Sequence, residues 1–153
     1  MKKKKLPRTR IPRIAIVTSR FNGKASEGLL NGALDSLHKK GISGKKVNVF
    51  HCPGAFEIPL TAKKLCETRK YDAIVCLGAV IKGETAHFEY ISYAVTKGII
   101  ELNLHYGIPV TFGVLTSYNE EQAMKRSMPD GRNKGAQAAE AALEMIELLR
   151  SVK

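Results

Sequence analysis

Residues 82–87 (KGETAH) bring together the kinds of group that proton transfer on an anionic substrate requires. An imidazole such as that of His87 gains and loses a proton near neutral pH. The backbone N–H groups at the start of a helix bind phosphate or carboxylate, and the Thr85 hydroxyl can add a further donor. Residue types alone therefore indicate acid–base chemistry beside an anion site. Thr85 has a structural alternative, because it could be the N-cap of a helix that begins at Ala86.

Further polar and aromatic residues follow the other predicted strands. These strands cover residues 13–18, 47–51, 73–81 and 110–115, and the run 73–81 (AIVCLGAVI) is apolar throughout, as in the centre of a parallel sheet. Ligands of an open parallel sheet bind where its strands end, so groups from all four strand ends can converge. The residues that follow the strands are Phe21 and Asn22, then 53–57, 82–87 and 116–119.

Helices are predicted between the strands, because apolar residues recur there every three or four positions. The predicted helices cover residues 25–40, 56–69, 86–106, a short segment opened by a capping box at Asn119 and Gln122, and 134–150. Strand and helix alternate along the chain. This alternation predicts an α/β fold, a three-layer α/β/α sandwich of the flavodoxin-like kind with a four-stranded parallel sheet.

The helical periodicity also predicts which side chains face the sheet. One apolar stripe of each long helix should pack inward. The stripes predicted in the helices 25–40, 86–106 and 134–150 are Leu30, Ala33, Leu34 and Leu37; Phe88, Ile91, Val95, Ile99, Leu102 and Tyr106; and Ala139, Leu143, Ile146 and Leu149.

The positive charge is concentrated at the N-terminus. Seven of the 25 basic residues lie in residues 1–13, and the other 18 face 14 acidic residues, which leaves +4 of the formal net charge of +11. We therefore expect residues 1–12 to be a flexible, solvated arm and residues 13–153 to be a single domain. The alternative is an arm that contacts a polyanion. The mildly basic body argues against a nucleic-acid-binding protein.

Composition places the chain among ordinary globular proteins. Of its 153 residues, 44% are hydrophobic. It has no apolar run of about 18 residues and no apolar segment after the basic N-terminus, so neither a membrane span nor a secretory signal is expected. Cys52, Cys66 and Cys76 are odd in number and lack the spacing of metal ligands. They predict reduced core thiols in a cytoplasmic protein without a metal site.

Several candidate residues also have a structural explanation. Phe21 and Phe56 could be core residues, and Glu57 could favour the positive end of a helix dipole. Arg126 could be a plain surface charge. Taken singly, these residues decide no function. The remaining histidines, which we interpret as ordinary surface or core residues, are His38, His51 and His105.

Taken together, four segments resemble a known family, lumazine synthase, the penultimate enzyme of riboflavin biosynthesis. The similarity runs from about residue 13 to 149 without an evident gap. Its most specific part is the block that follows the third strand. The four segments are 20–22 (RFN), 53–59 (PGAFEIP), 78–91 (GAVIKGETAHFEYI) and 133–143 (NKGAQAAEAAL).

The resemblance implies a transferase that uses no cofactor. The family condenses 5-amino-6-(D-ribitylamino)uracil with 3,4-dihydroxy-2-butanone 4-phosphate and gives 6,7-dimethyl-8-ribityllumazine, phosphate and water. An amine of the uracil attacks the ketone to form a Schiff base, phosphate is eliminated, and the ring closes. The substrates are small molecules, and no membrane is involved.

The resemblance also implies how the ribitylaminouracil is held. Phe21 matches the residue that stacks on the pyrimidine, whose edge is read by backbone groups of Ala79, Val80 and Ile81. Ala55, Phe56 and Glu57 match the segment that contacts the ribityl chain. Phe112 matches an aromatic residue lent by the neighbouring subunit, and Lys134 matches a lysine near the ligand.

A second set of residues would bind the phosphorylated substrate and move protons. The phosphate site maps to Glu84, Thr85 and Arg126, where Glu84 would serve only through its main-chain N–H because its side chain is acidic. His87 maps to the proton-transfer residue. One departure from the family is visible, since this chain has Gln137 where glutamate is common.

Assembly is implied as well, as a homopentamer with active sites at the subunit interfaces. Some members form a shell of twelve pentamers, in which the N-terminal segment adds to a neighbour's sheet. Here Pro7 and Pro12 lack the N–H that strand pairing uses, and Pro129 stiffens the turn before the last helix. We therefore expect an isolated pentamer, with the shell of sixty chains as the alternative. Riboflavin synthase is a candidate partner.

Three other functions compete with this interpretation. A non-catalytic riboflavin or lumazine carrier on the same scaffold would need neither His87 nor Arg126. A flavodoxin-like signalling receiver would need acidic residues after the first strand, where Arg20 lies instead. A nucleic-acid-binding protein would use the basic arm.

Overall fold

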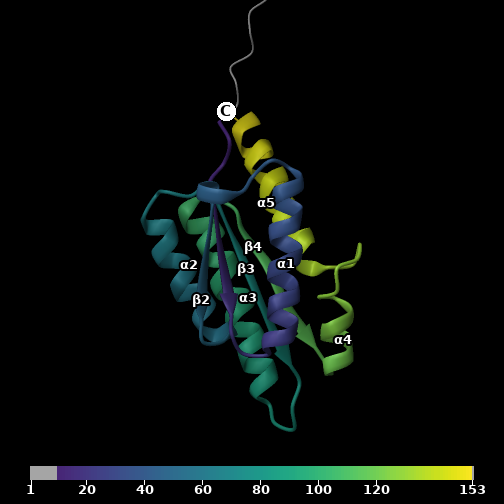
Figure 1. Cartoon of the computed structure of the whole chain (residues 1–153). Coiled ribbons are helices and arrows are strands. Elements are labelled where there is room, and N and C mark those ends of the chain that lie inside the picture. Colours follow the sequence, from purple (N-terminus) through teal and green to yellow (C-terminus); the bar gives the residue numbers. More distant parts are fainter. Residues whose placement is uncertain (1–9, 153) are drawn as a thin grey trace, which may run out of the picture.

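The computed structural model describes residues 10–152 and shows one four-stranded parallel sheet in the order β2-β1-β3-β4 (Figure 1). The strands are β1 (Ile14–Ser19), β2 (Val47–Cys52), β3 (Ala73–Ile81) and β4 (Val110–Ser117). The predicted strands agree within one or two residues. β4 extends two residues further than expected, because Thr116 and Ser117 continue the pairing with Val80 and Ile81.

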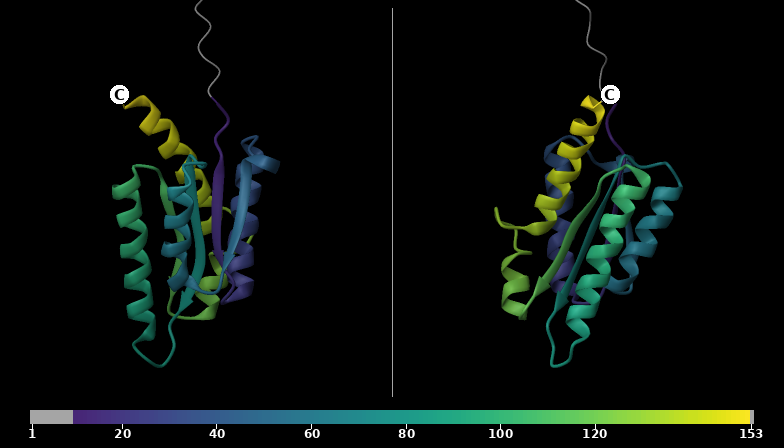
Figure 2. Two further views of the ribbon diagram at one scale, coloured as in Figure 1. Left: turned by 90° about the vertical axis from the view of Figure 1, so that its left-hand side faces the viewer. Right: turned by 180° about the vertical axis from the view of Figure 1, so that it is seen from behind.

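Five helices cover the two faces of the sheet, which confirms the predicted three-layer sandwich. Helices α1 and α5 pack on one face and α2 and α3 on the other (Figures 1 and 2). The helices are α1 (Gly23–Lys39), α2 (Ile58–Glu67), α3 (His87–Tyr106), α4 (Glu120–Lys125) and α5 (Lys134–Ser151), with short 3₁₀ turns η1 (Gly44–Lys46) and η2 (Ala55–Glu57).

β3 lies at the centre of the core because both of its faces are covered. Its residues from Ala73 to Val80 are all buried, as expected for an apolar strand between two helical layers. On one face the core also holds Leu29, Ala33 and Leu37 of α1, and on the other it holds Val95, Ile99 and Leu102 of α3.

The predicted inward stripes were partly wrong. Leu29, which the sequence analysis omitted, is fully buried, whereas Leu30 and Leu34 are only partly buried at the edge of the same cluster. The buried face of α1 is therefore shifted by about one residue relative to the predicted stripe. Leu149 was expected to face inward but is 42% exposed, since the inward stripe of α5 ends at Ile146.

The N-terminal arm is described only in its last residues, 10–12. The Arg10 side chain forms an ion pair with Asp72, whose other carboxylate oxygen accepts the Arg13 N–H (2.7 Å). Residues 1–9 lie outside the described part of the chain, so the expected flexibility of the arm stays a prediction. Among residues 10–152, none of the helices is long and apolar enough to cross a membrane.

Candidate active site

A cavity of about 790 Å³ opens at the carboxyl edge of the sheet, beside the loop between β3 and α3. This loop lies at the end of the molecule opposite to the C-terminus (Figure 2). The volume suits a small-molecule ligand. Nine predicted site residues line the cavity: Phe21, Ala55, Phe56, Glu57, Ala79, Val80, Ile81, Thr85 and His87. It is completed by Asn22, Pro53, Gly54, Gly83, Phe88 and Ile91.

The two phenylalanines of this cavity are largely exposed. Phe21 is 71% and Phe56 59% accessible, so neither is the core residue that the sequence left open as an alternative. Phe21 lies in the turn after β1, where its backbone N–H donates to the Pro53 carbonyl (3.0 Å). This bond ties the ends of β1 and β2 together. An exposed aromatic face in a cavity can stack on a flat heterocycle.

β3 projects beyond β1 and forms a backbone wall of the cavity. Its pairing with β1 ends at Thr18–Leu77, whereas its pairing with β4 continues to Ile81–Ser117. The backbone of residues 79–81 therefore borders the cavity on the side where β1 has ended. Such a strand end offers peptide donors and acceptors to the edge of a ligand.

Asn22 is a site residue to which the sequence analysis gave no role. Its Nδ2 donates to the Ala79 carbonyl (2.8 Å), and its backbone adopts the left-handed conformation (φ 58°). Asparagine tolerates this conformation better than most residues, so it suits a tight turn between strand and helix. An asparagine directly after a predicted strand was the signal that could have identified it.

Glu57 presents a carboxylate beside Gly54 at the end of β2. It is the N-cap of α2, and a Cβ atom at Gly54 would lie 3.1 Å from its Oε2. Burial, together with the negative charge of Glu57, raises the pKa of the neighbouring Cys52 thiol. Cys52 is therefore protonated at neutral pH and is no nucleophile. The buried free thiols Cys52, Cys66 and Cys76 confirm the expected core cysteines.

His87 occupies the first residue of α3, one position after the predicted start. The N-cap, Ala86, has no side-chain cap, and the His87 N–H lies 3.4 Å from the Thr85 hydroxyl. Both residues are exposed to the cavity. Glu84 belongs to the same loop but does not line the cavity. The start of a 20-residue helix here offers backbone N–H groups and a positive dipole end to an anion.

Phe112, Arg126 and Lys134 lie elsewhere, in a second cavity of about 460 Å³ along β4. No residue lines both cavities. β4 is an edge strand of the sheet and is separated from β1 and β2 by β3, so this second cavity lies on the side of the sheet away from those two strands. Within one chain, the structure thus brings nine predicted residues together and keeps these three apart from them.

Arg126 and Lys134 flank the turn between α4 and α5. Arg126 ends α4 and donates to the Gln122 carbonyl (3.0 Å), and the Lys134 N–H donates to the Arg126 carbonyl (2.8 Å). The Lys134 ammonium lies 2.8 Å from Oε1 of Gln137. Lys134 therefore donates to a neutral amide oxygen. Gln137 does not compensate the positive charge of Lys134 as a glutamate would.

Within residues 10–152, no group of three or more His, Cys, Asp or Glu side chains is placed to hold a metal ion. The groups at the first cavity are instead an imidazole, a carboxylate, a hydroxyl, aromatic rings and backbone amides. They suit binding of a polar heterocycle and proton transfer.

Comparison with known proteins identifies the family. Residues 12–150 match the family described as 6,7-dimethyl-8-ribityllumazine synthase. The chain belongs to this family. It is 49% identical over 140 residues to a protein of that name from Syntrophus aciditrophicus, an alignment that covers 92% of this chain and 91% of the relative. A 6,7-dimethyl-8-ribityllumazine synthase 1 from Caulobacter vibrioides is also 49% identical, over 142 residues and 93% of each chain.

This membership of the lumazine synthase family confirms the resemblance inferred from the four segments. Both cavities fall within the matched residues 12–150. Since the match spans nearly the whole of both relatives, it covers every element that shapes the two cavities.

Proposed function

We propose that this chain is a transferase of riboflavin biosynthesis that condenses 5-amino-6-(D-ribitylamino)uracil with 3,4-dihydroxy-2-butanone 4-phosphate to 6,7-dimethyl-8-ribityllumazine, phosphate and water. The observation that carries the proposal is the cavity at the carboxyl edge of the sheet. It gathers aromatic, carboxylate, amide and imidazole groups in a chain that belongs to the lumazine synthase family.

The uracil substrate would bind along the β1, β2 and β3 side of the cavity. The exposed ring of Phe21 stacks on the pyrimidine, and the backbone of 79–81 meets the pyrimidine edge. The segment 55–57 contacts the ribityl chain, where the Glu57 carboxylate accepts hydrogen bonds from hydroxyl groups. Asn22 keeps the Ala79 carbonyl in place.

The phosphorylated substrate would bind at the start of α3. The backbone N–H of Glu84 and the hydroxyl of Thr85 donate to phosphate, and the helix dipole favours its charge. The guanidinium of Arg126 completes the site from the second cavity, with two donors in a geometry that matches phosphate. Lys134 and Phe112 approach the ligand from the same side.

The reaction then needs proton transfers rather than a cofactor. An amine of the uracil adds to the ketone, and loss of water gives the Schiff base. Removal of a proton next to the imine lets the C–O bond to phosphate break and leaves an enol, which takes up a proton and becomes a ketone. The second amine attacks this ketone, and loss of a second water completes the ring. His87 is placed to accept and return these protons, because it lies beside the phosphate-binding helix start.

We further propose that a neighbouring subunit supplies the second set of residues. Phe112, Arg126 and Lys134 cannot act on a ligand in their own chain's first cavity if they remain in a separate cavity, and β4 is an open sheet edge. A head-to-tail contact that places this edge against the next subunit's cavity generates a closed ring.

The exposed face of α3 supports such a ring, a homopentamer. Its apolar residues Tyr90, Tyr93, Ile100 and Leu104 are 52–80% accessible and recur at the spacing of a coiled-coil seam. Apolar stripes of this kind are rarely left uncovered. The buried free thiols Cys52, Cys66 and Cys76 support a cytoplasmic location, and a riboflavin synthase that uses the product is a candidate partner.

The direct experiment is to supply the purified chain with both substrates and follow the fluorescent product. We expect turnover that saturates with each substrate. Binding of riboflavin or the lumazine without turnover would instead show the non-catalytic carrier.

A further inference from the structure

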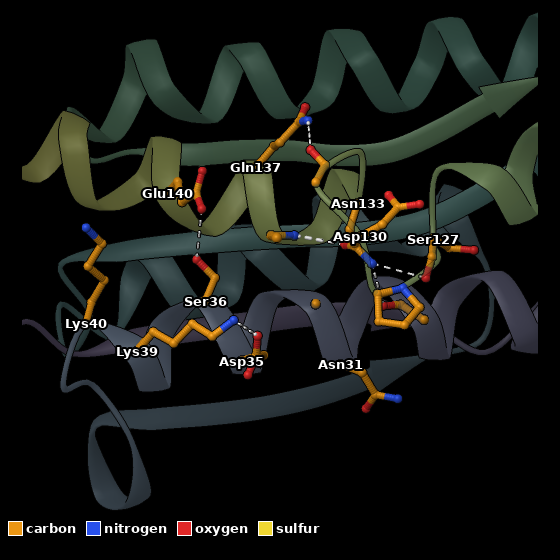
Figure 3. Close-up of a pocket in the computed structure, with 15 residues that line it drawn as sticks. Asn31, Asp35, Ser36, Lys39, Lys40, Ser127, Asp130, Asn133, Gln137 and Glu140 are labelled. Carbon is orange, nitrogen blue, oxygen red and sulfur yellow. Dashed lines mark hydrogen bonds and ion pairs between the residues drawn. The ribbon is translucent and has the colours of Figure 1, made fainter.

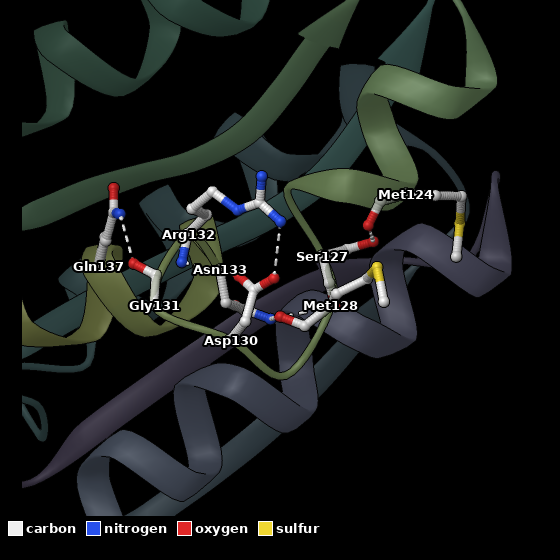
Figure 4. A network of polar contacts seen from close by, with 8 residues as sticks. All are labelled: Met124, Ser127, Met128, Asp130, Gly131, Arg132, Asn133 and Gln137. Atoms are coloured by element: carbon white, nitrogen blue, oxygen red, sulfur yellow. Dashed lines mark hydrogen bonds and ion pairs between the residues drawn. The ribbon is translucent and has the colours of Figure 1, made fainter.

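The turn between α4 and α5 carries the two cationic residues of the second cavity at its ends. Between Arg126 and Lys134, the residues Met128 to Arg132 are exposed (Figure 4). Ser127 and Asn133 are the exceptions, with 3% and 2% accessibility. A buried asparagine in a mostly exposed turn indicates that its side chain has a defined task.

The Asn133 amide bonds to three separate pieces of backbone. Its Nδ2 lies 3.1 Å from the Gly28 carbonyl of α1, 3.0 Å from that of Ser127 and 2.9 Å from that of Met128. Its Oδ1 accepts the Ala136 N–H (3.0 Å) and caps α5. An amide nitrogen has only two protons, so one of them is shared between two carbonyls. This one side chain joins α1, the turn and α5 (Figure 3).

Three glycines pack directly against Asn133 and the segments that it joins. A Cβ atom at Gly32 would overlap the Asn133 side chain, and one at Gly28 would overlap the Ser127 carbonyl. At Gly135, a Cβ atom would overlap the Leu29 carbonyl. The three glycines therefore allow α1 to approach the turn and the start of α5 at backbone contact.

The other side-chain bonds of the turn are exposed to water. They are the Arg132–Asp130 pair (3.0 Å), the bond from the Arg132 N–H to Asp130 (2.8 Å) and the bond from Gln137 to the Gly131 carbonyl (3.4 Å). Exposed pairs of this kind contribute about 0–1 kcal/mol. The buried amide of Asn133, together with the backbone bond from the Lys134 N–H to the Arg126 carbonyl (2.8 Å), therefore restrains the path from Arg126 to Lys134.

We infer that Asn133 is a positioning residue, which fixes Arg126 and Lys134 relative to each other so that they bind the phosphorylated substrate. This inference rests on the proposed function, because it assumes that both cations belong to the active site. The same amide ties them to α1, whose first residue, Gly23, follows Phe21 and Asn22. Asn133 therefore connects the second cavity to the helix that begins at the first one.

The test is Asn133→Ser, which keeps an oxygen to cap α5 but loses the three donor contacts. The matched control is Asn103→Ser. The Asn103 amide also makes three bonds to backbone, since it donates to the Ile99 and Val110 carbonyls and accepts the Val110 N–H, but it lies at the opposite edge of the sheet. For each variant, the KM of each substrate, inhibition by inorganic phosphate and the free energy of unfolding would be measured.

We expect Asn133→Ser to raise the KM of the phosphorylated substrate and the inhibition constant of phosphate by about 3- to 30-fold, with little change in the KM of the uracil. Asn103→Ser should lose comparable stability and change neither KM. Gly32→Ala is a second variant that displaces the amide while Asn133 is still present, and it should give the same selective rise. Since KM does not depend on the amount of active enzyme, partial unfolding does not mimic this result.

Arg126→Ala separates the positioning role of Asn133 from the proposed function. If Arg126→Ala weakens the phosphorylated substrate but Asn133→Ser and Gly32→Ala do not, the positioning role is wrong and the proposed function stands. If neither variant folds, or if Asn103→Ser shows the same rise, Asn133 is merely structural. If Arg126→Ala itself has no effect, the proposed phosphate site is wrong.

Discussion

The chemistry of the proposed site is divided between residues that bind and one residue that moves protons. His87 is exposed at the first turn of α3, within the cavity that also holds Phe21 and Glu57. The cations lie apart, on the β4 side. Substitutions should therefore separate proton transfer from phosphate binding.

His87→Ala should leave the fold intact, because the side chain is exposed and accepts no hydrogen bond that holds the loop. The condensation should slow by about 10- to 1000-fold, as expected for a lost acid–base group. The loss should be partial, since the substrates react without an enzyme. Steady-state rates at saturating substrates measure this, and a kcat equal to that of the parent would contradict the assigned role.

Arg126→Ala should weaken the binding of the phosphorylated substrate more than the binding of the uracil. A guanidinium–phosphate contact contributes about 1.5–3 kcal/mol, which corresponds to a rise in KM of roughly 10- to 150-fold. Lys125→Ala is a matched control, since Lys125 is the neighbouring cation but pairs with Glu121 (2.6 Å). Equal weakening of both substrates by Arg126→Ala would show that Arg126 does not hold the phosphate.

At the scale of elements, the sequence predicted the layers better than their contacts. The run 73–81 was recognised as the central strand because it is apolar throughout, and its bounds are those of β3. Thr116 and Ser117 were assigned to a loop because they are polar, yet they continue β4. Convergence of the strand ends followed from parallel topology alone. Periodicity did not predict that Arg126 and Lys134 line a separate cavity, because it does not say which neighbour an edge strand meets; for Phe112, only the resemblance implied a contribution to the neighbouring subunit.

The approach of α1 to α5 was likewise invisible in the apolar pattern. It depends on Gly28, Gly32 and Gly135, which carry no hydrophobic signal, and on the buried amide of Asn133. Asparagine before a predicted helix does indicate an N-cap, and this part of its role was accessible from the sequence. Its contacts with the carbonyls of Gly28, which is 105 positions away, and of Ser127 and Met128 across the turn could only be seen in the structure.

Gly135→Ala should destabilise the fold by about 1–3 kcal/mol, because its new methyl group would overlap the Leu29 backbone carbonyl and force the helices apart. Gly131→Ala is the control, since a Cβ atom at that position has no neighbour within 4 Å among the described residues. Urea unfolding of both variants measures the difference. Equal stability of the two would mean that α1 and α5 can separate without cost.

At the scale of the whole molecule, one chain presents two incomplete halves of a site. The first cavity lacks a strong cation, and the β4 cavity holds Arg126 and Lys134 without an acid–base residue. The proposed ring of subunits would join these halves and cover the apolar stripe of α3 at the same time. The proposal therefore couples turnover to the assembly state, and both can be measured.

The purified chain should sediment as a particle of five chains. The prolines of the N-terminal segment and of the turn before α5 disfavour the additional contacts of a shell, and like charges on gathered arms repel each other. Analytical ultracentrifugation at moderate salt tests this. A particle of about sixty chains would contradict the isolated pentamer, although it would retain the shared sites.

The central claim, that each active site combines two chains, is tested most directly by complementation. Phe21→Ala/His87→Ala destroys the first cavity, and Arg126→Ala/Lys134→Ala destroys the β4 side. When the two double variants are co-expressed in equal amounts, random assembly should pair an intact cavity with an intact β4 edge in about one quarter of the sites, and turnover should return to that level. Co-expression of two copies of the same variant is the control and should return no activity above that of the variant alone. Activity of the mixture that does not exceed that of the separate variants would show that the site lies within a single chain.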